Sequence, residues 1–97
     1  MKNTIFVFAT IYPKAENFAR AQEILEGIID DTRKEEGCIE FTLHKDNESK
    51  RLYLYEEWKD ELAIEKHFTY EYMTSVIDEF LSLLDIQTHI VKMVNIK

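Results

Sequence analysis

Short runs of apolar residues, either alternating or recurring at steps of three and four, divide the chain into expected strands and helices. Residues 4–12 are rich in β-branched and aromatic side chains, which predicts a strand that ends at Pro13. Because successive side chains of a strand point to opposite faces, the two predicted faces are Ile5, Val7, Ala9 and Ile11, and Phe6, Phe8, Thr10 and Tyr12. Both faces are largely apolar, so we expect neither to contact bulk water.

A long helix is predicted over residues 16–36, with Gly37 as its C-terminal stop. Its apolar residues recur at helical spacing and form one stripe, namely Phe18, Ala21, Leu25, Ile28 and Thr32, with Ile24 and Ile29 widening it. The acidic residues of the segment fall largely outside this stripe. The helix is therefore amphipathic.

Two further strands are predicted over residues 38–45 and 51–58, joined by a turn at 46–49. In the first, one face is expected to carry Ile39, Phe41 and Leu43, and the other Cys38, Glu40, Thr42 and His44. In the second, one face is expected to carry Leu52, Leu54, Glu56 and Trp58, and the other Tyr53, Tyr55 and Glu57.

Asp60 is expected to cap a short helix that runs to about Phe68, and Thr69 to cap the next helix. The second of these helices is predicted from the spacing of its apolar residues, which are Met73, Val76, Ile77, Phe80, Leu81 and Leu84. A last strand is predicted over residues 86–96.

The resulting order is β-α-β-β-α-β, with the second helix broken in two. It predicts an α+β fold of ferredoxin-like type, a four-stranded antiparallel sheet covered by helices on one face, in a single domain over residues 1–97. The open face of that sheet would carry apolar and aromatic side chains, and an exposed apolar face of this extent is typical of an interface. We therefore expect a homodimer packed sheet to sheet.

Charge and cysteine content narrow the range of partners. The net charge is −7, whereas binding to DNA or RNA needs clustered Lys and Arg, so nucleic acid is not expected as a partner. No segment approaches the roughly 20 apolar residues of a membrane span, and no membrane partner is expected. A single cysteine, Cys38, excludes an intrachain disulfide, and the expected location is the cytoplasm.

Candidate chemistry gathers where strand 51–58 meets the following helix. Glu56, Glu57 and Trp58 end the strand, and the helix carries His67. Such corners often form small-molecule pockets. A histidine has an ordinary pKa near neutrality, which suits a general base, although a His packed at a helix edge beside a carboxylate is the alternative interpretation.

The segments Glu35–Phe41 and Leu54–Asp60, followed by Ala63 and His67, resemble the antibiotic biosynthesis monooxygenase superfamily. The resemblance runs from about Ile5 to Val94, and the most similar branch is that of the small quinol monooxygenase-like proteins. It implies a dimeric α/β barrel with one pocket per subunit between sheet and helices. Several relatives oxygenate electron-rich aromatics without metal or flavin, whereas others isomerise small signalling molecules, degrade haem or have no assigned activity.

The resemblance implies a cofactor-independent monooxygenase acting on a quinol-like or polyphenolic aromatic and O₂. His67 is the expected catalytic base, and Glu57 matches the glutamate of the family and would orient it, with a strand-end salt bridge as the alternative. The expected pocket walls are Trp58, Tyr70, Tyr72 and Phe8, although packing is the alternative role for Trp58 and Phe8.

Other functions are disfavoured or left open. The three histidines share no short ligand spacing and there is no second cysteine, so a metal is not expected. The resemblance implies that no other cofactor is needed. Relatives that degrade haem use an Asn in the first strand and a Trp and a His farther on, in helices. Haem degradation is disfavoured here because residues 5–12 contain no Asn and the only Trp ends a strand. An RNA-recognition domain shares the element order, but its basic residues are missing. A non-catalytic or isomerase-type dimer that binds a small molecule remains an open alternative.

Overall fold

The computed structural model describes residues 3–97. The helices and strands follow in the order β1 (Ile5–Pro13), the 3-10 turn η1 (Ala15–Asn17), α1 (Phe18–Arg33), β2 (Cys38–Asp46), β3 (Arg51–Trp58), α2 (Glu61–His67), α3 (Glu71–Ser82) and β4 (Leu84–Met93). None of the helices within this range is long and apolar enough to cross a membrane.

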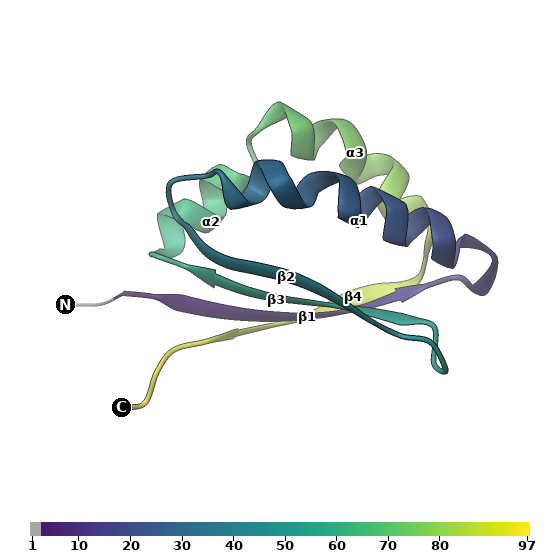
Figure 1. Ribbon diagram of the computed structural model, residues 1–97, viewed down its shortest axis with the longest axis horizontal. Helices are drawn as coiled ribbons and strands as arrows, with labels where there is room; N and C mark the ends of the chain where they lie inside the picture. The colour runs from purple at the N-terminus through teal and green to yellow at the C-terminus, as the bar shows by residue number, and fades with distance from the viewer. Residues whose placement is uncertain (1–2) are drawn as a thin grey trace.

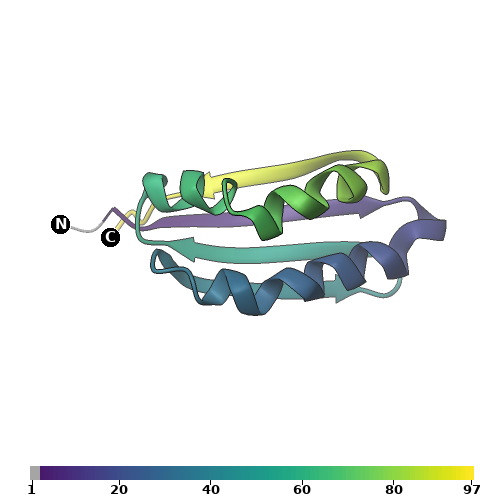
Figure 2. The same ribbon diagram turned by 90° about the horizontal axis from the view of Figure 1, so that it is seen from above.

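The four strands form one sheet in the order β2-β3-β1-β4, and each neighbouring pair is antiparallel. All helices lie on one side of the sheet and leave the other side open (Figure 1). Seen from above, α1 and α3 run along the strands (Figure 2). The predicted ferredoxin-like α+β fold is confirmed.

The register of the sheet decides which side chains face the helices. Val7 pairs with Glu56, and Ala9 pairs with Leu54. Cross-strand partners share a face, so Glu56 lies on the helix-covered face with the buried Val7, Ala9 and Leu54. Phe8 pairs with Tyr55 and Val91 on the open face. The predicted alternation of β1 and β3 is confirmed.

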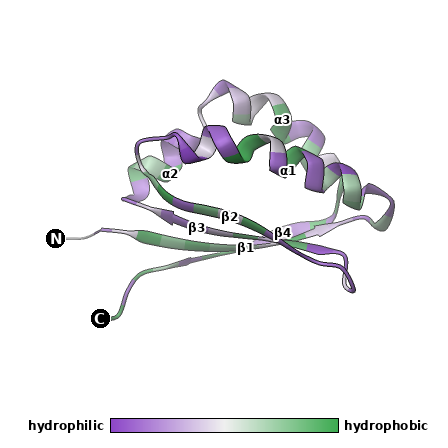
Figure 3. Cartoon of the chain, in the orientation of Figure 1, coloured by the Kyte–Doolittle hydropathy of each residue, from purple (hydrophilic) through white to green (hydrophobic). Residues whose placement is uncertain are grey.

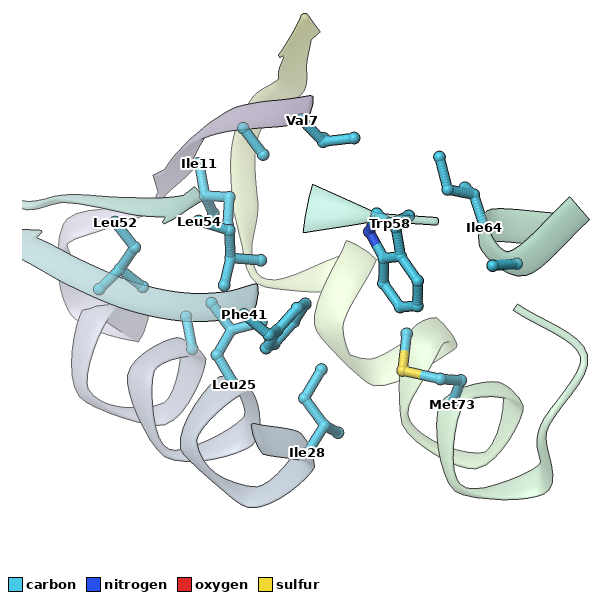
Figure 4. Packing of buried hydrophobic residues seen from close by; sticks show 13 residues of the cluster. Val7, Ile11, Leu25, Ile28, Phe41, Leu52, Leu54, Trp58, Ile64 and Met73 are labelled. Atoms are coloured by element: carbon cyan, nitrogen blue, oxygen red, sulfur yellow. The ribbon is translucent and has the colours of Figure 1, made fainter. Parts of the chain in front are cut away.

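A hydrophobic core fills the space between the sheet and the helices. Figure 3 shows hydrophobic segments of β1 and β2 beneath α1, whose ribbon alternates between hydrophobic and hydrophilic colour. The buried residues of α1 are those of the predicted stripe, namely Ala21, Ile24, Leu25, Ile28 and Thr32. In Figure 4 the side chains of Phe41, Ile64 and Met73 surround the fully buried Trp58.

Two predicted details are wrong, one in β2 and one at the start of α3. A bulge between Cys38 and Glu40 adds one residue to β2, so Ile39 is 54% exposed and Cys38 packs against the core in its place. Asp60 does cap α2, because its side chain accepts a hydrogen bond from the Ala63 amide at 2.9 Å. Thr69 does not cap α3, because its hydroxyl donates to the Lys66 carbonyl instead.

The role predicted for Gly37 is also wrong. Helix α1 ends at Arg33, before the glycine, and Gly37 does not adopt a positive φ. What matters at this position is the absence of a side chain, because a Cβ atom here would lie 2.3 Å from the Cβ of Ala63 in α2. Gly37 therefore lets the loop before β2 approach α2, the helix that carries His67.

A pair of glycine substitutions tests this close approach. Gly37→Ala should lower the free energy of unfolding by about 1–3 kcal/mol, because α2 or the loop must move apart. A Cβ atom added to Gly27 in α1 would meet no neighbouring group within 4 Å, so Gly27→Ala should raise stability by about 0.5–1 kcal/mol. Urea unfolding of both variants measures the two effects. Equal stabilities for the two variants would contradict this explanation of Gly37.

Candidate functional site

A cavity of about 290 Å³ lies between the helix-covered face of the sheet and helices α1, α2 and α3. Its walls are mostly apolar, and its polar lining residues are Glu56, His67, Gln87 and Thr88. The apolar lining comes from both layers and includes Ala9, Ile28, Phe41, Leu54, Met73, Phe80 and Ile90. An apolar hollow with a few polar groups is typical of small-molecule sites.

His67 is held at the last turn of α2 with its ring nearly buried, at 3% residue exposure. The ring Nδ1 lies 2.8 Å from Oε2 of Glu35, a carboxylate in the loop after α1 whose side chain is also buried. The same carboxylate oxygen accepts a hydrogen bond from the Tyr72 hydroxyl. Tyr72 in turn lies 3.0 Å from the Thr32 hydroxyl. Glu35 therefore joins α1, α2 and α3 in one polar cluster.

The hydrogen bonds of this cluster orient the imidazole of His67. An ionised carboxylate only accepts hydrogen bonds, so Nδ1 carries the proton that it shares with Glu35 and Nε2 is left as an acceptor. Within residues 3–97 no buried side-chain nitrogen or oxygen lacks a partner, and Nε2 forms no hydrogen bond there. Nε2 is therefore open to the cavity that His67 lines.

Tyr72 serves as a neutral donor in this cluster. Burial and the hydrogen bond to Glu35 raise the pKa of the Tyr72 hydroxyl above its ordinary value. The hydroxyl therefore keeps its proton at neutral pH and donates it to the carboxylate. Its single O–H is used in this way, so the Thr32 hydroxyl donates to the Tyr72 oxygen.

Glu56 is the other ionisable group of the cavity. Its Oε1 accepts a hydrogen bond of 2.8 Å from the indole N–H of Trp58. Burial raises the pKa of the Glu56 carboxyl, and the bond from Trp58 and the nearby His67 offset part of this effect. Its second oxygen, Oε2, forms no hydrogen bond with residues 3–97 and is open to the cavity.

Trp58 does not line the cavity but lies behind both polar groups. It is 0% exposed, and its ring centroid lies 4.9 Å from that of His67. The ring of Phe41 packs edge to face against the indole, with centroids 6.5 Å apart. The predicted role of Trp58 as a pocket wall is therefore replaced by a supporting one, in which the indole holds Glu56 by a hydrogen bond and His67 by packing.

Glu57 and Phe8 lie on the open face of the sheet, away from the cavity. The predicted pairing of Glu57 with His67 is wrong, because Glu57 accepts a hydrogen bond of 2.8 Å from Tyr55 and borders an open hollow of about 470 Å³ near Ile39. Phe8 stacks on Tyr53 with ring centroids 5.9 Å apart, so it is not part of the cavity floor. Neighbouring residues of a strand point to opposite faces, which separates Glu57 from Glu56.

The two tyrosines at the start of α3 also lie outside the cavity. Tyr70 and Tyr72 stack with centroids 6.1 Å apart, and Tyr70 is 38% exposed. Both line surface depressions next to Glu35 rather than the apolar cavity. Neither is therefore a pocket wall, and Tyr72 instead acts through Glu35.

Sequence reasoning missed the roles of Glu35 and Glu56. The alternation of β3 places Glu56 on the face of Trp58, so the signal for Glu56 was present in the sequence. Glu35 lies 32 residues before its partner His67, and no local pattern joins the two. The pKa of the Cys38 thiol is raised to about 11 by burial and by the nearby carboxylates of Glu35 and Glu56, so this side chain stays a neutral thiol.

Comparison with known proteins places these features in a family. Residues 4–79 match the family model described as antibiotic biosynthesis monooxygenase. The chain belongs to the antibiotic biosynthesis monooxygenase family. The match covers the part of the chain that carries Glu35, Glu56 and His67. Membership supports a monooxygenase-type function and leaves the substrate undefined.

Two similar proteins share the fold with this chain at low sequence identity. The protein named "Putative monooxygenase Rv0793", from Mycobacterium tuberculosis, is 25% identical over 67 residues, which span 69% of this chain and 66% of that protein, just under two thirds of its length. The solved structure of Rv0793 matches with a TM-score of 0.91 at 19% identity, covering 98% of this chain and 97% of that one. A conserved protein from Methanosarcina mazei matches with a TM-score of 0.86 at 28% identity, covering 95% and 92%.

Proposed function

We propose that this protein is a cofactor-independent monooxygenase that acts on a quinol-like or polyphenolic aromatic. One observation carries the proposal. An imidazole with its Nδ1 held by the buried Glu35 carboxylate presents a free Nε2 to an apolar cavity of about 290 Å³. A base in a dry aromatic-sized hollow suits a substrate that becomes reactive once it loses a proton.

The proposed reaction begins with proton transfer from a substrate hydroxyl to Nε2 of His67. The negative charge of Glu35 stabilises the imidazolium that forms, because it lies at hydrogen-bond distance from Nδ1. The electron-rich substrate anion then transfers an electron to O₂. One oxygen atom enters the substrate and the other leaves as water, whose two hydrogens come from the substrate. The apolar walls keep bulk water from the intermediates.

We also propose that a second copy of the chain covers the open face of the sheet. Phe8 is 38% exposed there and Met93 39%, in a patch that also includes Phe6, Tyr53, Tyr55 and Val91. Arg51 and Glu57, of opposite charge, belong to the same face. A two-fold interface places one patch against its own copy, and a surface with aromatic, basic and acidic groups is suited to pair with itself.

The second candidate function is a dimer that binds or isomerises a small aromatic molecule without oxygenating it. The low polarity of the cavity walls favours binding of an aromatic equally in both cases. The two functions differ in one measurable property, because only the monooxygenase consumes O₂ with its ligand.

Oxygen uptake tests the catalytic role of His67. With a naphthohydroquinone as substrate, His67→Ala should lower the enzyme-dependent rate by about 10²–10⁴-fold, since general base catalysis is worth that much. His44→Ala, which changes an exposed histidine of β2, serves as the control and should keep the full rate. An oxygen electrode measures both variants. Full turnover by a folded His67→Ala variant would overturn the role of the base.

Sedimentation tests the proposed homodimer. Phe8→Glu should shift the protein toward the monomer in analytical ultracentrifugation, because it buries a charge in the sheet-to-sheet interface. Leu62→Glu places the same charge on the outer side of α2, where Leu62 is 61% exposed, and should leave sedimentation unchanged. A wild-type protein that sediments as a monomer at every concentration would contradict the proposal.

A further inference from the structure

The second free polar atom of the cavity is Oε2 of Glu56. Glu56 and His67 both line the hollow, and both contact Trp58, one through the indole N–H at 2.8 Å and the other through ring packing at 4.9 Å. A ligand that reaches Nε2 of His67 therefore lies next to the carboxyl group of Glu56. The geometry provides two neighbouring points of polar contact in a cavity whose other polar lining residues, Gln87 and Thr88, come from β4.

The hydrogen bond from Trp58 decides which oxygen of Glu56 can carry a proton. Oε1 accepts the indole N–H, so a proton on the carboxyl group is confined to Oε2, the oxygen open to the cavity. The cross-strand neighbours of Glu56 are Val7 and Phe41, which supply no charge. Lys92, on the same face of β4, is paired with Glu61 at 2.5 Å. No Lys or Arg among residues 3–97 lines the cavity, so no such side chain faces Glu56 there to hold it ionised.

We infer that Glu56 acts as a hydrogen-bond donor that recognises a second oxygen of the substrate, while His67 takes the proton from the first. The inference rests on the proposed function and specifies its substrate class. The ligand is an aromatic that carries two oxygen functions, one for each polar group. It has one or two rings, because 290 Å³ lies just below the roughly 300–1,000 Å³ typical of ligand sites.

The donor role also has a chemical consequence. When Nε2 of His67 removes the proton of one hydroxyl, the electron pair stays on the substrate and spreads through the ring to the second oxygen. A neutral Glu56 donates a hydrogen bond from Oε2 to that oxygen as negative charge grows on the oxygen. The proton of the substrate hydroxyl is then on Nε2 of His67, and the carboxyl proton stays on Glu56. The burial that raises the pKa of the Glu56 carboxyl supports this protonated form. A ligand carboxylate at the same place would have no cation opposite it.

Binding of two related compounds tests the inference without turnover. Under nitrogen, calorimetry should show that the wild-type protein binds naphthohydroquinone about fivefold more tightly than naphthol, which lacks the second hydroxyl. Glu56→Gln should keep this preference, because the amide also accepts from Trp58 and donates to the ligand. Glu56→Leu should bind both compounds equally. Glu65→Gln, at an exposed position of α2 outside the cavity lining, is the control and should behave as wild type.

Several outcomes would overturn the assignment. They are a preference that survives in Glu56→Leu, a preference that is lost in Glu56→Gln, or no binding of either compound. If Glu56→Leu does not fold, infrared difference spectra of wild type against Glu56→Gln decide the question, since the ligand-bound wild type must show the carbonyl band of a protonated carboxyl group and its absence overturns the assignment. Oxygen uptake by the same samples in air is measured separately, so a binding preference without oxygen uptake overturns only the monooxygenase proposal.

Discussion

The candidate site depends on the contacts of one buried side chain, the indole of Trp58, with Glu56 and His67. It is fully buried in the core, where it lies among Phe41 of β2, Ile64 of α2 and Met73 of α3 (Figure 4). Its N–H donates a hydrogen bond to the Glu56 carboxyl, and its ring packs against that of His67 with centroids 4.9 Å apart. A buried indole needs a partner for its N–H, and here the demand is met by the carboxyl group that faces the cavity. The same side chain therefore packs in the core and positions the two polar groups of the site.

A second constraint is the alternation of side chains along β3. Glu56 and Trp58 face the helices, whereas Tyr55 and Glu57 face the open side of the sheet and bond to each other at 2.8 Å. One strand thus supplies polar groups to two separate environments. The helix-covered side carries the candidate site, and the open side is the one that the proposed dimer would use.

Local patterns in the sequence predicted most of the fold. The stripe of α1, the faces of β1 and β3 and the Asp60 cap follow from periodicity and capping, and the structure has all of them. Ile39 was placed on the wrong face because a bulge inserts one residue, which an alternating pattern does not reveal. A glycine after a helical pattern predicts a helix stop, as at Gly37. Its actual role, the close approach to Ala63, depends on tertiary packing that a local pattern does not reveal.

The site was predicted less well than the fold. The sequence predicts His67 as a site residue, because this histidine follows a carboxylate-rich strand end. It also predicts Glu57 as the partner of His67, whereas the structure pairs His67 with Glu35. Glu35 and Tyr72 come from a loop and a helix that meet only after folding, so their bonds to one another and to His67 have no local signature. Membership of the antibiotic biosynthesis monooxygenase family supports the proposed monooxygenase activity. The polar cluster explains how His67 is oriented.

The tautomer of His67 tests the central claim most directly. Long-range ¹H–¹⁵N spectra of the imidazole resolve which ring nitrogen carries the proton and whether the other contacts a ligand. We predict a proton on Nδ1, shared with Glu35, and a bare Nε2 whose signal moves when naphthohydroquinone is added under nitrogen. A proton on Nε2 in the free protein, or an Nε2 signal that ignores saturating ligand, would contradict this claim.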